Sequence, residues 1–202
     1  MKDVQTTGGA KKPGPRKALL RISFTALFAA LMAAGTFIVI PVGPVPVVLQ
    51  NLFALLGGLV LGPAMGAAAT ALYLFAGLVG APVFAGASGG VAHFAGPTGG
   101  FLVGYLLMPL VGGLIAGRPG TTEAGGESPR RFNGRLLAAV IAGFLVVYLP
   151  GIPWLKFSGG LSWPRAFTAG FLPFIAGDAA KGAAAFLIAP RLRRLAGDYL
   201  YG

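Results

Sequence analysis

The sequence predicts an all-α integral membrane protein, a bundle of six transmembrane helices with an irregular outer loop rich in glycine and proline. Hydrophobic residues make up 55% of the 202 residues and charged residues only 10%, and the mean hydropathy is +0.79. Several apolar runs approach the ~20 residues that a helix needs to cross ~30 Å of hydrocarbon. The 34 glycines and 16 prolines suit membrane helices, in which small side chains let backbones approach closely.

The residue types that are missing exclude several kinds of chemistry. The chain has no cysteine and one histidine, His93, so a disulfide, a thiol nucleophile and a zinc site are not expected. It has no G-x-x-x-x-G-K-[ST] phosphate loop, and therefore no recognisable means of hydrolysing ATP by itself. No nucleophile has a base or an orienting group at workable spacing. We expect neither an enzyme nor a bound metal or cofactor.

The distribution of positive charge orients the predicted spans. The net charge of +11 is compatible with nucleic acid, but the basic residues cluster in two tails and one loop, which fall on the same side if the chain crosses the membrane six times. These residues are Lys2, Lys11, Lys12, Arg16, Lys17, Arg21, Arg118, Arg130, Arg131, Arg135, Arg191, Arg193 and Arg194. Lys156 and Arg165 are left for the other side, so the positive-inside rule places both termini in the cytoplasm. We expect a multi-pass protein of the cell membrane and no nucleic-acid partner.

Three regions follow in order along the chain. Residues 1–17 form a basic tail that is too polar to bury apolar surface and is expected to be disordered. Residues 18–190 form the membrane domain, and residues 191–202 a second basic cytoplasmic tail. The six predicted spans are 22–40, 47–61, 64–80, 101–117, 136–153 and 166–190.

The first predicted span carries a face of small residues. Ala26, Ala30 and Ala34 recur at the small-xxx-small spacing that lets a second helix pack closely. The partner of this face is either another helix of the same bundle or a separate subunit. Both interpretations remain open from the residues alone.

Polar groups interrupt the next two spans. The prolines of residues 41–46 exclude helix and predict a short outer connection. Gln50 and Asn51 then lie near the outer end of the second span, where they are either solvated or line an outward-facing cavity. A tight inner turn at 62–63 leads to the third span, which carries Tyr73 near its middle.

Residues 81–100 read neither as a good helix nor as a polar loop. The segment combines many glycines with apolar Val83, Phe84 and Phe94, and irregular backbone near a membrane is tolerated where protein buries it or a cavity borders it. It therefore predicts a cover over a binding site, with free backbone groups for a small polar ligand. His93 is equally compatible with an interfacial position and with a ligand contact.

Asp178 and Lys181 are two opposite charges within the apolar sixth span. A spacing of three residues places them on one helix face, close enough to pair or to hold one polar ligand together. An ionisable residue at the centre of a membrane helix costs ~2.5 to 3.5 kcal/mol on insertion scales, which favours a functional site facing the bundle interior. The alternative is a structural ion pair.

These motifs together resemble one family. They are Pro44-Val45-Pro46 through Leu49-Gln50, Gly80-Ala81-Pro82-Val83-Phe84 through Gly96-Pro97-Thr98-Gly99-Gly100, Tyr148-x-x-Gly151-x-x-Trp154-Leu155, and Gly177-Asp178-x-x-Lys181. Over residues 18–190 the chain resembles the BioY family, the biotin-specific substrate-binding subunits (S components) of energy-coupling factor (ECF) transporters. The resemblance implies biotin capture at the outer face, and assembly with a transmembrane coupling subunit and two ATPases.

The resemblance also implies roles for individual residues. Asp178 and Lys181 inherit the ligand contacts of the family's sixth helix, and the alanine-rich first helix implies that Ala26, Ala30 and Ala34 dock on the coupling subunit. Biotin needs an acceptor for its ureido N–H, donors for its C=O and apolar surroundings for its ring and chain. The further candidate substrate-binding residues are Gln50, Tyr73, Phe84, Gly86, Ser88, Tyr148 and Trp154. Two alternatives remain, a solitary proton-coupled transporter in which Asp178 carries the proton, and an S component for another vitamin.

Overall fold

The computed structural model describes residues 14–40, 47–120 and 134–201. Most of the predicted N-terminal tail (1–13), the proline-rich connection (41–46) and most of the predicted inner loop (121–133) lie outside the described residues, as does residue 202. The helices are α1 (Pro15–Gly35), α2 (Gln50–Leu61), α3 (Pro63–Leu78), α4 (Val91–Ala95), α5 (Gly99–Ala116), α6 (Gly134–Val146), α7 (Tyr148–Ser158), α8 (Trp163–Gly170), the 3₁₀ turn η1 (Leu172–Phe174) and α9 (Ile175–Leu200). Two short strands, β1 (Val39–Ile40) and β2 (Val47–Val48), pair antiparallel.

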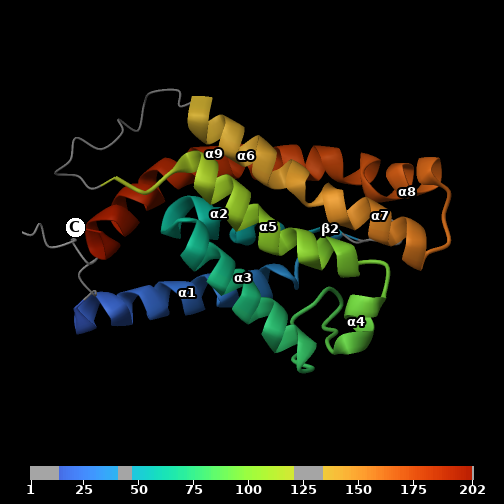
Figure 1. The fold of residues 1–202 in the computed structure, drawn as a ribbon, viewed down its shortest axis with the longest axis horizontal. Helices are drawn as coiled ribbons and strands as arrows, with labels where there is room; N and C mark the ends of the chain where they lie inside the picture. The colour runs from blue at the N-terminus through green and yellow to red at the C-terminus, as the bar shows by residue number, and fades with distance from the viewer. Residues whose placement is uncertain (1–13, 41–46, 121–133, 202) are drawn as a thin grey trace, which may run out of the picture.

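The long helices run roughly along one axis of the molecule (Figure 1). The start of α1 and the end of α9 lie at one end of the bundle, and α4 and α8 lie at the other (Figure 1). Helix α5 is central, because it packs against α2, α3, α6 and α7. Helix α9 closes the bundle against α2 and α6.

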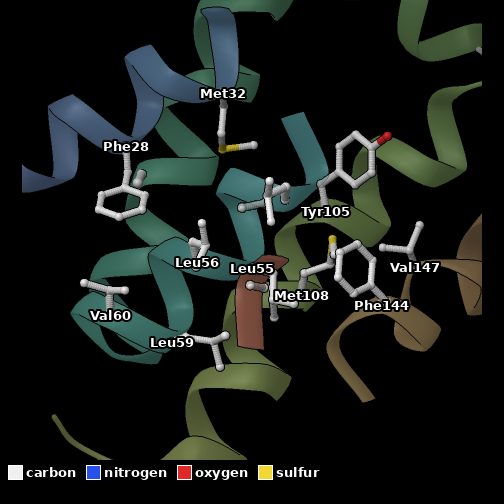
Figure 2. Close-up of a cluster of buried hydrophobic side chains, with 14 of the residues drawn as sticks. Phe28, Met32, Leu55, Leu56, Leu59, Val60, Tyr105, Met108, Phe144 and Val147 are labelled. Atoms are coloured by element: carbon white, nitrogen blue, oxygen red, sulfur yellow. The ribbon is translucent and has the colours of Figure 1, made fainter. Parts of the chain in front are cut away.

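The core is built where α2 meets α5. Leu55, Leu59 and Met108 are fully buried there, and Figure 2 shows Met108 close to Phe144 of α6. The backbones approach so closely that a Cβ added at Gly58 would lie 2.3 Å from the Cα of Pro109. Small residues thus set the helix spacing, as in other membrane bundles.

Four helical segments of the described chain are long and apolar enough to cross a membrane: Pro15–Gly35, Gly99–Ala116, Gly134–Ser158 and Trp163–Leu200. Helices α2 and α3 are apolar but shorter. The 12 residues of α2 cover about 18 Å at 1.5 Å per residue. The predicted span at 47–61 begins as β2, and only its remainder is helical.

The last two predicted spans are interrupted helices. The fifth divides at Val147 into α6 and α7, and the sixth contains α8, η1 and α9. Pro150 and Pro173 lie just beyond the breaks; a proline has no N–H to donate to the carbonyl four residues earlier, and its ring crowds that carbonyl.

Several predicted boundaries also differ from the structure. Helix α1 begins at Pro15, inside the predicted tail, and α9 continues through Pro190 to Leu200. The extension of α9 is packed, because the buried Arg193 donates hydrogen bonds to the carbonyls of Leu59 at 2.5 Å and Ala116 at 3.1 Å. The basic residues at 191–194 are therefore helical, and Arg193 holds the ends of α2 and α5 together.

Candidate functional site

The centre of the site is an ion pair on α9 that α2 completes. Lys181 Nζ lies 2.6 Å from Asp178 Oδ1, with side chains only 8% and 12% exposed. Asn51 contacts both charges: its Oδ1 accepts from Lys181 Nζ at 2.8 Å and its Nδ2 donates to Asp178 Oδ1 at 3.1 Å. Lys181 also donates to the carbonyl of Val48 at 3.3 Å. Buried charges are tolerated when paired and hydrogen-bonded in this way.

Tyr148 completes the surroundings of the carboxylate. Its hydroxyl donates to Asp178 Oδ2, so both oxygens of Asp178 accept hydrogen bonds. Phe171 packs edge-on against the Tyr148 ring, with centroids 4.7 Å apart. The cluster therefore joins α2, α7 and α9, and it presents acceptors and donors side by side in apolar surroundings.

A second polar cluster is centred on Gln50. Its Oε1 accepts from Thr36 Oγ1 at 2.7 Å and from the hydroxyl of Tyr73 at 2.6 Å. The Tyr73 oxygen also lies 3.0 Å from the carbonyl of Val83, which belongs to the 81–100 segment. Gln50 and Tyr73 thus tie that segment to the bundle, and no contact of theirs with the Asp178–Lys181 pair is seen among the described residues.

The 81–100 segment packs on the bundle through Phe84. This side chain is fully buried, and its ring lies 5.6 Å from that of Tyr73 and 5.4 Å from that of Phe94. Gly77 makes room for it, since a Cβ there would lie 2.0 Å from the Phe84 ring. The segment is more regular than predicted, because it contains α4 and a bridge between Phe84 and Ser88.

His93 links the two ends of the same segment. It stacks on Phe84 with centroids 4.9 Å apart, and its Nδ1 and Nε2 lie 2.9 Å from Ser88 Oγ and 3.2 Å from Thr98 Oγ1. Ser88 Oγ donates to the carbonyl of Ala85 at 2.8 Å, so it accepts from Nδ1–H, and Nε2 then accepts from Thr98. Burial lowers the pKa of His93 and so favours the neutral imidazole that makes these two bonds.

We expect the protein to lose stability in mild acid because of His93, which lies outside the predicted spans. Burial lowers the pKa of His93 below its ordinary value, whereas an unfolded chain keeps a pKa of ~6.5. The contribution of neutral His93 to the free energy of unfolding is therefore complete above pH ~6.5 and is lost as the pH falls below that value. Unfolding midpoints in detergent at a series of pH values measure the effect. His93→Gln retains polar contacts without titrating, so an equally steep loss in that variant would contradict the assignment.

Two small cavities, each of about 20 Å³, lie beside the polar clusters. The first is lined by Gln50, His93 and Thr98, the second by Asn51, Asp178 and Lys181. Val48, Phe101 and Tyr105 line both. The two cavities are therefore neighbours, and only the first borders the 81–100 segment.

A larger groove lies on the other side of the ion pair. It has a volume of about 440 Å³ between α6 and α9, and its lining is apolar except for Asp178 and the Tyr148 hydroxyl. Phe144, Phe171 and Phe186 provide much of the surface. Asp178 therefore borders both the second small cavity and this groove.

The predicted site residues do not all meet at one place. Asp178, Lys181 and Tyr148 are in direct contact, whereas Gln50, Tyr73, Phe84 and Ser88 gather around the 81–100 segment. Gly86 lies in an exposed turn with φ of 74°. Trp154 is 42% exposed and donates from Nε1 to the carbonyl of Gly96 at 2.9 Å. Neither of these two lines a described cavity.

The alanines of the first helix face outward. Ala26, Ala30 and Ala34 are exposed, whereas Phe28 and Met32 on the opposite face are buried. This face is therefore unoccupied by other described parts of the chain.

The comparisons with known proteins agree on one family. Residues 10–198 match the BioY family. The chain is 41% identical to "Probable biotin transporter BioY" of Pyrococcus horikoshii over 172 residues, 85% of this chain and 95% of that protein. It is 39% identical to "Biotin transporter BioY" of Thermotoga maritima over 169 residues, 84% and 93% of the two chains. The chain belongs to the BioY family.

A solved structure extends the match to the fold. The crystal structure of an S-component for biotin from an ECF-type ABC transporter superposes on this BioY-family chain with a TM-score of 0.78. The sequence identity is 28%, and the match covers 90% of this chain and 94% of the other. The predicted family and S-component fold are thereby confirmed.

Sequence reasoning left two important residues of this BioY-family chain out of the candidate set. The sequence indicates that Asn51 is either solvated or lines a cavity, whereas in the structure it bridges both charges. Its position next to Gln50 at the start of an apolar helix is the available signal. Tyr105 lines both small cavities and carries no polar neighbour in sequence, so nothing in the sequence distinguished it from a packing residue. Among the described residues no group of three metal-ligating side chains occurs.

Proposed function

We propose that this chain is the substrate-binding membrane subunit of an ECF-type biotin transporter. The observation that carries the proposal is the cluster of Asp178, Lys181, Asn51 and Tyr148 inside the helix bundle, in a chain of the BioY family. A ureido ring needs an acceptor for each N–H and donors for its C=O. Asp178 supplies the acceptor, and Lys181 and Asn51 supply donors.

Binding requires the site to open, and the 81–100 segment borders the cavity next to it. A cavity of about 20 Å³ has room for about one water molecule and is far smaller than a bicyclic ligand with a chain. The contacts that must separate include the Trp154 bond to Gly96, the Gly90 N–H bond to the carbonyl of Gly77 and the packing of Phe84. Opening there exposes Gln50 and Tyr105 to the ligand, and closing buries it.

We propose six spans, made by α1, α2, α3, α5, α6 with α7, and α8 with α9, and a membrane domain at about residues 18–190. Both termini lie in the cytoplasm, because the flanking positive charge gathers at that end, and the 81–100 segment lies outside. In this arrangement the protein sits in the cell membrane and captures biotin from outside. It assembles with a transmembrane coupling subunit and two ATPase subunits, since the chain has no phosphate loop of its own.

The solitary proton-coupled carrier is the less favoured function. A proton-carrying carboxylate must exchange its proton during transport, and Asp178 is held by Lys181, Asn51 and Tyr148 in a fully paired arrangement. Uptake into vesicles separates the two functions. An ECF subunit requires the ATPase partners and ATP, whereas a solitary carrier works without them and stops when the proton gradient is collapsed.

Ligand binding by the purified chain in detergent tests the proposal directly. We expect saturable binding of biotin and none of thiamine or riboflavin, because the donors and acceptors around Asp178 fit one ureido ring. Isothermal titration with the three vitamins measures this. Binding of thiamine or riboflavin in preference to biotin would assign the chain to another vitamin, and binding of none of the three would overturn the proposal.

A further inference from the structure

A separate cavity lies at the end of the bundle where α1 begins and α9 ends (Figure 1). Its volume is about 480 Å³. Four parts of the chain line it: α1 through Arg21, the α2–α3 turn, the end of α5 and the residue after α9, Tyr201. None of its lining residues belongs to the biotin site proposed above.

The charge of this cavity is positive. Arg21 and Arg118 both line it, and the buried Nε of Arg21 has no hydrogen-bond partner in the structure. The carboxylates of the described chain are Asp178 and Asp198, and neither is among the lining residues. Two guanidinium groups in one hollow, with no lining carboxylate from the described residues, favour an anionic ligand.

Other groups of the cavity add donors and shape. Helix α3 begins at Pro63 without a side-chain cap, and its first-turn residues Ala64 and Met65 line the cavity. First-turn N–H groups of a helix have no partner within the helix and attract anions. Tyr201 fixes the opposite side: its hydroxyl donates to the carbonyl of Leu61 at 2.9 Å, and its ring lies 5.7 Å from the guanidinium of Arg21.

Two nearby arginines bind backbone carbonyl groups at the ends of helices. Arg193 donates to the carbonyls of Leu59, Ala116, Gly117 and Arg118, and Arg135 donates to that of Ile115. Those guanidiniums satisfy helix C-termini. The Arg21 Nε makes no hydrogen bond of that kind with the described residues, so this atom does not cap a helix C-terminus.

We infer that this cavity binds a phosphate group. The surroundings favour the headgroup of an anionic phospholipid as its source. Exposed Leu114 lines the cavity, and Leu19 and Ile22 beside Arg21 are 65% and 66% exposed. A phosphate held by the two arginines thus has apolar helix surface next to it on which acyl chains lie, at the level where membrane helices end. Such a lipid contacts α1, the start of α3 and the end of α5, and it stabilises their packing.

Native mass spectrometry of the purified chain tests this inference. The protein is loaded with equal amounts of phosphatidylglycerol and phosphatidylcholine, and the retained lipid is counted. We expect retention of phosphatidylglycerol, and a loss of about tenfold in Arg21→Gln/Arg118→Gln, because charge-assisted bonds to phosphate are removed. Arg16→Gln is the control for charge on α1: it removes one positive charge from the start of that helix, as Arg21→Gln does, but Arg16 does not line the cavity.

A second arm distinguishes the source of the phosphate. Inorganic phosphate at millimolar concentration is added to the lipid-loaded protein, and then to the delipidated protein. Failure to displace the lipid identifies a lipid site, whereas displacement with the same dependence on Arg21 and Arg118 identifies a site for soluble phosphate. Equal retention by wild type and double variant, or an equal loss in Arg16→Gln, would overturn the inference. If the double variant does not fold, Arg118→Gln alone, at an exposed position, provides the same readout.

Discussion

Asp178→Asn is expected to weaken biotin binding severely. The change removes the counter-charge 2.6 Å from Lys181 and replaces one acceptor of the carboxylate by an amide donor, which faces the hydroxyl of Tyr148 or the amide of Asn51. Disrupting buried, charged hydrogen bonds costs about 2 kcal/mol or more, which corresponds to at least roughly thirtyfold in affinity. Lys181→Met is expected to do comparable harm. Isothermal titration with biotin in detergent measures both variants.

The double variant Asp178→Asn/Lys181→Met separates binding from folding. Breaking a buried pair from one side is costly, but removing both charges is often neutral for stability. We therefore expect the double variant to recover the unfolding midpoint that each single variant lowers, while its affinity for biotin stays as weak as in the single variants. If the double variant also recovered wild-type affinity, the pair would be a structural bridge and the ligand contacts would lie elsewhere.

The sequence contained enough information for the class of fold and for the family. Apolar composition predicted membrane helices, and the motifs around Gly80 and Gly177 predicted the BioY family; both are confirmed, while the count of six spans stays a prediction. The helix boundaries were harder to predict. Proline alone does not decide them, because Pro190 lies inside α9 whereas Pro150 and Pro173 follow breaks. Tertiary packing decides between these outcomes, as the contacts of Arg193 illustrate for the end of α9.

The candidate site was predictable where residues are close in the sequence. A spacing of three residues on one helix was sufficient to place Asp178 beside Lys181. Asn51 comes from α2, and its contact with both charges depends on how α2 crosses α9. The hydrophobic periodicity of the sequence does not predict that crossing. Trp154 is a comparable case. It is only six residues from Tyr148 in the sequence, yet it donates its hydrogen bond to the carbonyl of Gly96 in the 81–100 segment and not to the ion-pair cluster.

The exposed face of α1 leads to the last expected result. Ala26, Ala30 and Ala34 are exposed although Ala29 on the adjacent face is 8% exposed. The described bundle therefore does not use these three alanines for its own packing. A surface of small side chains on a membrane helix allows another helix to approach closely, and the coupling subunit is the partner proposed for it.

The Ala30→Leu variant is expected to retain biotin binding in detergent. It is expected to lose both its association with the coupling subunit and ATP-dependent uptake. The added atoms stand where two helices would meet, and overpacking typically costs ~1 to 3 kcal/mol, a weakening of severalfold to about a hundredfold. Co-purification with the coupling subunit and uptake into vesicles measure it. Ala138→Leu makes the same change at an exposed position of α6 and should preserve both, whereas Ala29→Leu, at a buried position, should lower stability itself. Loss of folding or of biotin binding in Ala30→Leu, with co-purification intact, would instead make the alanine face an internal packing surface.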